Sequence, residues 1–280
     1  MVTDHQLEHI ACPCCGADEA RLWCEEEGFR VSKCSLCGFL YLNPRPSEQS
    51  KKQAISDGRH SGYSEHSIVE RRNEKKIRRY KRLLGTALAE FWNKKEDCTW
   101  LDVGCGYGEV LESVTGLATP TSRIVGVEPM PHKANQAQAK GLSVHNGFIS
   151  DIEGKFDFIS LIDVFSHLTN PDGLFSQIRA KLNPGGTFVF ETGNLADLEE
   201  RSMFPGDLGL PEHVIFGGRG SLETFLSRNN FTVEKYVPIR IDGFLYFAKN
   251  IVKKALGRSV RISLPYSSPY RSFIIIAKPV

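Results

Sequence analysis

The chain has 280 residues, of which 41% are hydrophobic and 24% are charged, and its formal net charge is +2. This length and balance are typical of a globular protein with one large domain and a smaller one, and the small net charge gives no electrostatic argument for a nucleic-acid or membrane partner. No apolar run approaches the roughly 18 residues that a membrane-spanning helix needs, and residues 1–9 contain no signal-peptide core, so we expect a cytoplasmic protein.

Two Cys-x-x-Cys pairs stand near the N-terminus, Cys12 with Cys15 and Cys34 with Cys37, and eighteen residues separate the pairs. This spacing is typical of a zinc ribbon, in which each pair places two thiolates on a tight turn and four thiolates hold a tetrahedral zinc ion. Because the protein fills every ligand position, the pattern predicts a closed, structural site that supplies folding energy to a segment with little core of its own. Because the cysteines are spaced as metal ligands rather than as disulfide partners, we expect the protein in a reducing compartment.

Other uses of these cysteines remain open. Cys14 and Cys24 compete as ligands, and we favour Cys12 and Cys15 because their spacing matches that of the second pair. The alternative is a set of reduced cysteines that bind no metal, or a disulfide.

The run from Cys34 to Pro46, Cys-Ser-Leu-Cys-Gly-Phe-Leu-Tyr-Leu-Asn-Pro-Arg-Pro, carries a more specific signal. It resembles the zinc-binding module that precedes the methyltransferase domain in a group of bacterial enzymes, among them sugar C-methyltransferases and relatives from polysaccharide or natural-product pathways. The resemblance covers residues 10–46 and implies a zinc ribbon over residues 1–46.

Residues 47–97 are predicted to connect the two parts. Residues 47–68 are polar and we expect a linker or loop, in which Tyr63 is either a lid contact or an ordinary loop aromatic. From Ile68 to Trp92, apolar residues at helical spacing predict one helix. Its other face is strongly basic, and we expect a solvated face, the alternative being a patch for RNA or anionic lipid.

An apolar run, Thr99 to Val103, ends in three glycines at alternate positions, Gly104, Gly106 and Gly108, and a helix-compatible run follows. The pattern predicts a strand, a tight turn and a helix. Without β-carbons, the turn lets a ligand lie on the backbone at the carboxyl end of the strand. Glu128 closes the next apolar run and is placed to accept hydrogen bonds from the hydroxyls of a ribose.

The order Asp102-x-Gly-x-Gly-x-Gly108 resembles the first motif of class I S-adenosylmethionine-dependent methyltransferases. In a dinucleotide site the third glycine comes one position later, where this chain has Glu109, whose carboxylate would repel a pyrophosphate. Asp102 suits a ligand that carries a sulfonium and an ammonium group. The alternative is an ordinary strand–helix turn.

Later segments follow the family's order. They are a strand from Phe156 to Asp163 that begins Phe-Asp, the turn Leu182-Asn-Pro-Gly-Gly186, and a strand from Thr187 to Glu191. The resemblance covers residues 98–237 and the last strand, 272–277. It implies an α/β fold over residues 98–280, with a Rossmann-like seven-stranded sheet and helices on both faces. After the fourth strand, many relatives have an acid where this chain has Ser166.

The resemblance also implies which residues contact the cofactor. We expect Asp102 and the glycine turn at the amino-acid end of the cofactor, and Glu128 on its ribose. Phe148 is expected to pack on the adenine ring, and Asp163 to lie near the amino-acid end or the acceptor. The predicted cofactor residues are Asp102, Gly104, Cys105, Gly106, Gly108, Glu128, Phe148 and Asp163.

Candidate catalytic residues follow the strands at their carboxyl ends, where α/β sheets bind ligands. His167 follows the fourth strand, Glu191 and Asn194 follow the fifth, and Glu212-His213 precedes a predicted helix. The segment from Pro211 to Leu222 resembles the family's Pro-x-His…Phe…Ser-Leu segment. Sugar C-methyltransferases associate a Glu-His pair there with proton abstraction, which implies Glu212 and His213 as candidates; the alternative is that His213 only pins the loop.

A second basic stretch, Lys249 to Arg261, adjoins the apolar run Phe244 to Phe247. We expect this segment to pack against the core. The alternatives are an amphipathic helix on a membrane surface and part of a substrate lid.

We therefore predict an S-adenosylmethionine-dependent methyltransferase with a structural zinc ion, acting by O- or C-methylation on a small molecule or a sugar or polysaccharide precursor. One alternative is an RNA methyltransferase, but no Asn/Asp-Pro-Pro-Tyr/Phe segment follows the fourth strand and nucleic acid is not the expected partner. The other is a non-catalytic adaptor, against which the intact glycines and Glu128 argue. The acceptor atom and the oligomeric state stay open.

Overall fold

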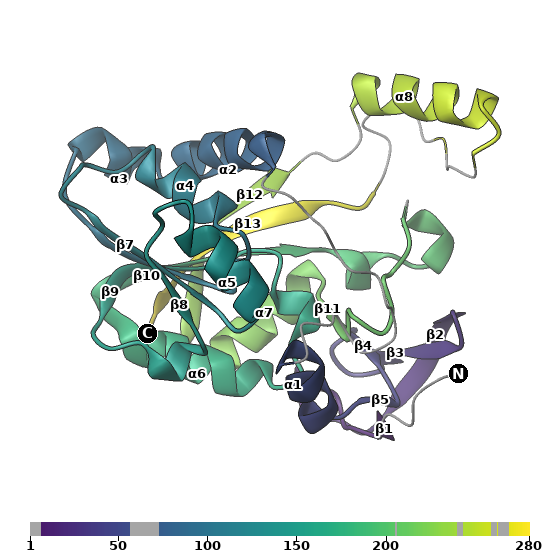
Figure 1. The fold of residues 1–280 in the computed structure, drawn as a ribbon. Coiled ribbons are helices and arrows are strands. Elements are labelled where there is room, and N and C mark those ends of the chain that lie inside the picture. The colour runs from purple at the N-terminus through teal and green to yellow at the C-terminus, as the bar shows by residue number, and fades with distance from the viewer. Residues whose placement is uncertain (1–6, 57–72, 205, 240–242, 259–261, 263–268) are drawn as a thin grey trace.

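A seven-stranded sheet with the order β12-β13-β10-β9-β6-β7-β8 forms the centre of the protein (Figure 1). The computed structural model describes residues 7–56, 73–204, 206–239, 243–258, 262 and 269–280. The strands are β6 (Thr99–Val103), β7 (Arg123–Glu128), β8 (Val144–Asn146), β9 (Phe156–Leu161), β10 (Leu182–Gly193), β12 (Phe231–Ile239) and β13 (Ser272–Pro279). All neighbours pair in parallel except β13, which is antiparallel to both β10 and β12. The predicted Rossmann-like fold is confirmed.

Helices cover both faces of the sheet (Figure 1). The described helices of the whole chain are α1 (Glu48–Ser56), α2 (Glu74–Ala87), α3 (Ala89–Lys94), α4 (Glu109–Thr115), α5 (Pro131–Gln138), α6 (Pro171–Lys181), α7 (Arg219–Arg228) and α8 (Phe244–Ala255), with single 3-10 turns η1 (Ile149–Asp151), η2 (Phe165–His167), η3 (Leu195–Asp197) and η4 (Arg201–Met203). Because side chains alternate along a strand, Trp100 packs with α2 and α4 while Leu101 packs with α6 and α7.

The N-terminal residues form a second sheet, with the order β11-β4-β3-β2, and a short pair, β1 with β5. These strands are β1 (Leu7–Glu8), β2 (Ala20–Glu26), β3 (Phe29–Cys34), β4 (Leu40–Leu42), β5 (Arg45–Pro46) and β11 (Ile215–Phe216). β11 comes from the far end of the chain and pairs with β4, Ile215 opposite Tyr41. Phe39 packs edge-on against Phe165, so the two sheets share one core. The predicted division at residues 46 and 97 stays a prediction.

The structure corrects two expectations for the connecting segment. Where we expected a linker, α1 forms: Ser47 Oγ accepts a hydrogen bond from the Ser50 amide at its start, and Lys52 pairs with Glu48 at 2.8 Å. Residues 57–72, with Tyr63, lie outside the described residues. The helix expected from Ile68 to Trp92 is two helices, α2 and α3, because the backbone of Leu88 leaves helical geometry between them.

The expectation that the segment after Phe244 packs on the core is wrong. α8 stands apart from the sheet and its helices (Figure 1), and the side chains of Phe244 and Leu245 are 68% and 85% exposed. Asn250, on another side of α8, is buried. The apolar face of this helix is therefore turned to water.

Candidate active site and metal centre

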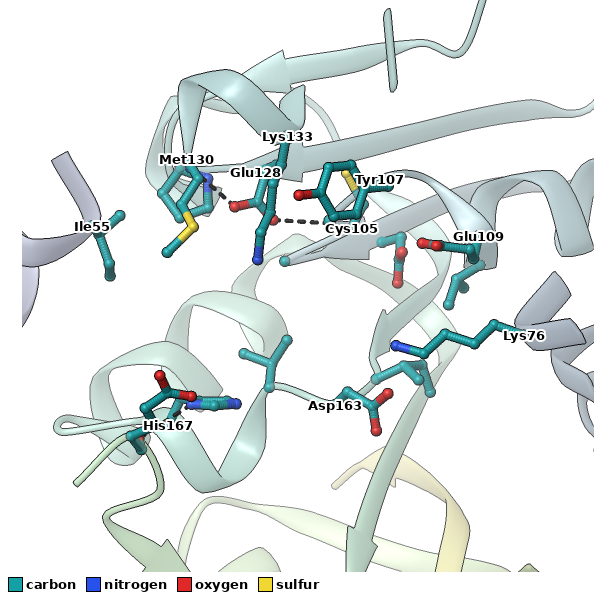
Figure 2. A pocket seen from close by; sticks show the side chains of 18 of the residues that line it. Ile55, Lys76, Cys105, Tyr107, Glu109, Glu128, Met130, Lys133, Asp163 and His167 are labelled. Atoms are coloured by element: carbon teal, nitrogen blue, oxygen red, sulfur yellow. Dashed lines mark hydrogen bonds between the residues drawn. The ribbon is translucent and has the colours of Figure 1, made fainter. Parts of the chain in front are cut away.

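A cavity of about 410 Å³ lies at the carboxyl ends of β6, β7 and β9 (Figure 2). This volume is in the range of sites for small ligands. Its wall includes residues of the glycine turn, the end of β7, the end of β9, and α1 and α2. Of the predicted site residues, those on this wall are Asp102, Gly104, Cys105, Gly106, Glu128, Asp163, His167, Glu212 and His213.

The glycine turn requires the absence of side chains. Gly104 and Gly106 have φ of +73° and +55°, which disfavours other residues. A β-carbon on Gly104 would lie 2.6 Å from Val164, whereas nothing lies within 4 Å of one on Gly106, so the backbone there is open to a ligand. Gly108 is not on the wall. It caps α4, and a β-carbon on it would lie 2.2 Å from Leu142.

Glu128 ends β7 with its side chain buried. Its Oε2 accepts a hydrogen bond from the Gly106 amide and its Oε1 one from the Met130 amide, each at 2.9 Å (Figure 2). Each carboxylate oxygen has a second lone pair, so the carboxylate can still accept two hydroxyls. Cys105, the residue before Gly106, is also on the wall, and its Sγ packs against Gly126 of β7.

Asp102 is fully buried at the end of β6. Ser160 donates a hydrogen bond to its Oδ1 at 2.5 Å, and Trp100 donates in turn to Ser160 at 2.8 Å. Burial raises the pKa of Asp102 to about 7; the bond from Ser160 opposes this shift and the charge of Glu128 adds to it. The carboxyl group is therefore costly to ionise without a positive ligand beside it.

The cavity is more acidic than basic. Its wall carries five acids, Asp102, Glu109, Glu128, Asp163 and Glu212, and three lysines, Lys51, Lys76 and Lys133. A wall of this kind favours a ligand with positive charge.

The structure places Phe148 away from this wall. Its side chain is 48% exposed and is not among the residues that line the cavity. Met130 and Tyr107 are on the wall instead. The sequence analysis missed both, although Met130 stands only two residues after Glu128.

A second cavity, of about 360 Å³, adjoins the first. The two share the wall residues Asp163, Val164, His167 and His213. The second has a largely apolar wall that includes Phe165, Phe204, Leu208, Ile215, Phe216 and Tyr270. A small, partly apolar molecule fits such a wall, and its reacting group would lie against the shared residues.

Two histidines stand between the cavities, with ring centroids 4.6 Å apart. Nδ1 of His213 lies 2.7 Å from the carbonyl of Leu208, and Nδ1 of His167 lies 3.1 Å from the carbonyl of Glu212. A carbonyl only accepts, so Nδ1 is the protonated nitrogen and Nε2 of neutral His213 keeps a lone pair. Burial lowers the pKa of His213, which favours this neutral form.

Lys51 of α1 ties the two histidine loops together. Its ammonium donates to the carbonyl of Glu212 at 2.7 Å and to that of His167 at 3.1 Å. Burial lowers its pKa to about 8. The sequence analysis missed Lys51 because its partners are 116 and 161 residues away.

Two acids, Asp163 and Glu191, also lie on the wall of the second cavity. Asp163, whose φ of +57° is unusual for a residue with a side chain, accepts a hydrogen bond from Tyr80 at 2.6 Å. Glu191 binds Arg79 through Oε1, while its Oε2 is buried without a hydrogen-bond partner among the described residues. Burial and the charge of Asp163 raise the pKa of Glu191 to about 8. Two residues of the basic face of α2, Lys76 and Arg79, thus face this region rather than solvent alone.

The four predicted metal ligands converge. The Sγ atoms of Cys12, Cys15, Cys34 and Cys37 all lie within 4.8 Å of one another, with two of the distances at 3.6 Å. Sulfurs about 2.3 Å from a tetrahedral zinc ion lie about 3.8 Å apart, so the set fits that ion. Cys14 points away and donates to the carbonyl of Ser221 in α7, so it does not compete.

Comparison with known proteins agrees with this geometry. A family model described as a methyltransferase domain matches residues 70–236, which is more than half of the chain. The chain belongs to this methyltransferase family. The matched residues include the glycine turn, Glu128 and both histidines of the candidate site. Among the described residues, no helix is long and apolar enough to cross a membrane.

The methyltransferase has curated relatives over part of its length. The ubiquinone biosynthesis O-methyltransferase of Bradyrhizobium sp. (strain ORS 278) is 30% identical over 105 residues, 34% of this chain and 39% of that protein. That of Colwellia psychrerythraea (strain 34H / ATCC BAA-681) is 29% identical over 105 residues, 35% of this chain and 43% of that protein. The match thus spans less than half of each relative.

Solved structures share the fold of the methyltransferase. The PH0226 protein of Pyrococcus horikoshii OT3 is similar with a TM-score of 0.51 and 17% identity, over 74% of this chain and 93% of that chain. Magnesium protoporphyrin IX methyltransferase from Synechocystis PCC 6803, with bound SAH, is similar with a TM-score of 0.47 and 15% identity, over 75% of this chain and 89% of that one.

Proposed function

We propose that the enzyme methylates a hydroxyl oxygen of a small acceptor bound in the second cavity. The observation that carries this proposal is the shared wall of the two cavities, where Asp163, His167 and His213 lie. A donor in the first cavity and an acceptor in the second would meet there, and positioning is most of what methyl transfer needs from a protein. The names of the curated relatives, which are O-methyltransferases, support oxygen as the acceptor atom.

S-adenosylmethionine fits the first cavity on three counts: the open backbone at Gly106, the lone pairs left on Glu128, and the acidic wall. When bound, it supplies a methyl group on a positively charged sulfur. We assign the ribose to Glu128, the backbone contacts to Gly104 and Gly106, and the positive end to Asp102 and Asp163.

His213 is the base of this proposal. Its Nε2 would take the proton of the acceptor hydroxyl as the new oxygen–methyl bond replaces the sulfur–methyl bond of the donor, while Nδ1 would keep its hydrogen bond to the Leu208 carbonyl. His167 and Glu212 would position it, since both belong to the network centred on Lys51. Oε2 of Glu191, buried on the wall of the second cavity, would bind a second polar group of the acceptor.

The zinc ion of this proposal is structural. Its ligands would be Cys12, Cys15, Cys34 and Cys37, all from protein, which leaves no open position for substrate.

The cofactor assignment is tested with Glu128→Gln. The amide retains only one acceptor atom for two backbone donors and the ribose, so we expect the Kd for S-adenosylmethionine to rise about tenfold or more. Isothermal titration calorimetry measures this, with exposed Glu153→Gln as the control. An unchanged Kd in Glu128→Gln would refute the ribose role.

The acceptor assignment is tested by incubating the enzyme with isotopically labelled S-adenosylmethionine and a panel of small hydroxylated compounds. We expect label in a methyl ether, and loss of transfer when the acceptor hydroxyl is replaced by hydrogen. Label on carbon or nitrogen, or only on RNA, would overturn O-methylation of a small molecule.

A further inference from the structure

The outward face of α8 is an apolar surface that no described residue covers. Phe244, Leu245, Ile251, Val252 and Leu256 are 68%, 85%, 43%, 58% and 74% exposed. At 100° per residue these side chains fall on one broad face of the helix. A surface helix packed on its own protein buries such a face, so this orientation is the reverse of the usual one.

The opposite side of α8 holds a buried polar residue. Asn250 is only 4% exposed and makes a polar contact. The helix therefore buries a polar side chain while its large apolar side chains stay exposed, which is the reverse of the usual arrangement.

The charge around the apolar face is entirely positive. Lys249 and Lys254 lie at its two edges, with Lys253 and Arg258 close by, and no acid occurs from residue 244 to residue 258. None of these four side chains forms an ion pair with a described residue. An anionic surface would complement this helix, whereas a neutral apolar partner would leave the four charges unused.

The length of α8 restricts how it can meet a lipid. It has 12 residues, so at about 1.5 Å per residue it is too short to cross a bilayer. An apolar face with lysines along its edges is typical of a helix that lies in the plane of the headgroups.

The strands that flank α8 in the chain end beside the second cavity. The helix is inserted between β12 and β13, where Ile239 pairs with Ser272, and Ser272 also pairs with Gly193 at the carboxyl end of β10. Ser272 and Gly193 are both on the wall of the second cavity. The insertion therefore leaves the sheet at the edge where the acceptor is proposed to bind.

We propose that α8 docks the enzyme on the surface of a bilayer rich in anionic phospholipid, with its apolar face between the headgroups and its lysines on the phosphates. The docked helix holds the edge of the sheet that carries the second cavity close to the lipid surface.

The experiment is co-sedimentation of the full chain with vesicles of phosphatidylcholine alone or mixed with phosphatidylglycerol. We expect binding to the mixed vesicles that weakens as salt is added. The double variant Leu245→Glu/Val252→Glu should lower the partition coefficient about tenfold or more. Leu22→Glu, an exposed leucine on β2 that is 51% accessible, is the matched control and should not change it.

The role of charge is tested with Lys249→Glu/Lys253→Glu, which should lower the partition coefficient at least about fivefold. Lys94→Glu on α3 is the control.

Circular dichroism and S-adenosylmethionine binding verify that each variant is folded. No binding to mixed vesicles, or equal loss in the controls, would overturn the proposal. So would a dimer, seen by light scattering, that Leu245→Glu/Val252→Glu dissociates, because the face would then join two copies of the chain. Vesicle binding is read without turnover, so its failure leaves the proposed reaction untouched.

Discussion

The buried carboxyl of Asp102 lowers the stability of the free protein, and we expect it to favour the binding of a positively charged ligand. In the free protein its carboxyl is buried, and its pKa is raised from 3.8 to about 7. The folded state thus holds a proton that the unfolded state releases between about pH 4 and 7, and the free energy of unfolding falls as the pH rises through that window. A cationic ligand in the cavity would reverse this cost.

We predict that Asp102→Asn removes this dependence. Asparagine keeps the acceptor oxygen for Ser160 but carries no charge. Relative to the wild type, the variant should gain about 2–4 kcal/mol of unfolding free energy between pH 4 and pH 8, and it should bind S-adenosylmethionine more weakly. Urea unfolding of the ligand-free proteins measures the first effect, with exposed Asp18→Asn as the control. Parallel stability curves for Asp102→Asn and the wild type would contradict it.

Two substitutions of His213 distinguish a role as the catalytic base from a role in holding the loop by a hydrogen bond. His213→Asn retains an N–H group that can donate to the Leu208 carbonyl but has no basic nitrogen, whereas His213→Ala loses both. If Nε2 takes the proton, both variants should lose about a hundredfold or more in kcat while the Kd for S-adenosylmethionine stays nearly constant. In the wild type, kcat/KM should fall at acid pH as His213 takes up a proton, with the midpoint below about 6.5, because burial lowers its pKa. Recovery of activity in His213→Asn would favour the pin.

Site residues could be predicted from the sequence where they stand at the end of a strand. Glu128 ends β7 and the glycines follow β6, so their position at the edge of the sheet follows from the local pattern. The contacts of Lys51 and the pairing of Glu191 with Arg79 depend on which distant segments the fold brings together. Phe148, which we expected on the adenine ring, is not on the wall of the first cavity, so that assignment stays a prediction.

At the level of elements, β4 is as important to the candidate site as the strands of the large sheet. It follows the second cysteine pair and binds β11, which begins two residues after His213. The Leu42 amide also donates to the carbonyl of Val214, and the Val214 amide donates to that of Ser166. The N-terminal sheet is therefore connected by backbone hydrogen bonds to the loops of both histidines.

We predict that Cys34→Ser lowers zinc content and also lowers kcat. Loss of one thiolate weakens the site, and disorder at β4 would release β11 and the loop before it. Metal analysis and steady-state kinetics measure the two effects, with Cys24→Ser, which lies outside the cluster, as the control. Full zinc content in Cys34→Ser would show that the ligand set is wrong; lost zinc with unchanged kcat would show that the ribbon does not support the site.

At the scale of the whole molecule, the two sheets act as one body. Phe39, Tyr41 and Leu42 of the N-terminal sheet and the turn before it are fully buried in the same core as Phe165 and Phe225. Such a core resists separate unfolding of the N-terminal module, because burial on one side depends on the other. The insertion that carries α8 is the exception, since its apolar face lies outside this core.

Local patterns in the sequence are enough to predict the kind of fold, the glycine turn, the carboxylate at the end of β7 and the four converging thiols. These follow from short-range rules: strand periodicity, backbone freedom at glycine, and the spacing that a tetrahedral ion requires. Three features are visible only in the folded chain: two cavities meet at His167 and His213, β11 joins the N-terminal sheet, and α8 turns its apolar face outward. Each of these depends on contacts between residues far apart in the chain, and an amphipathic pattern states which face is apolar but not what, if anything, covers it.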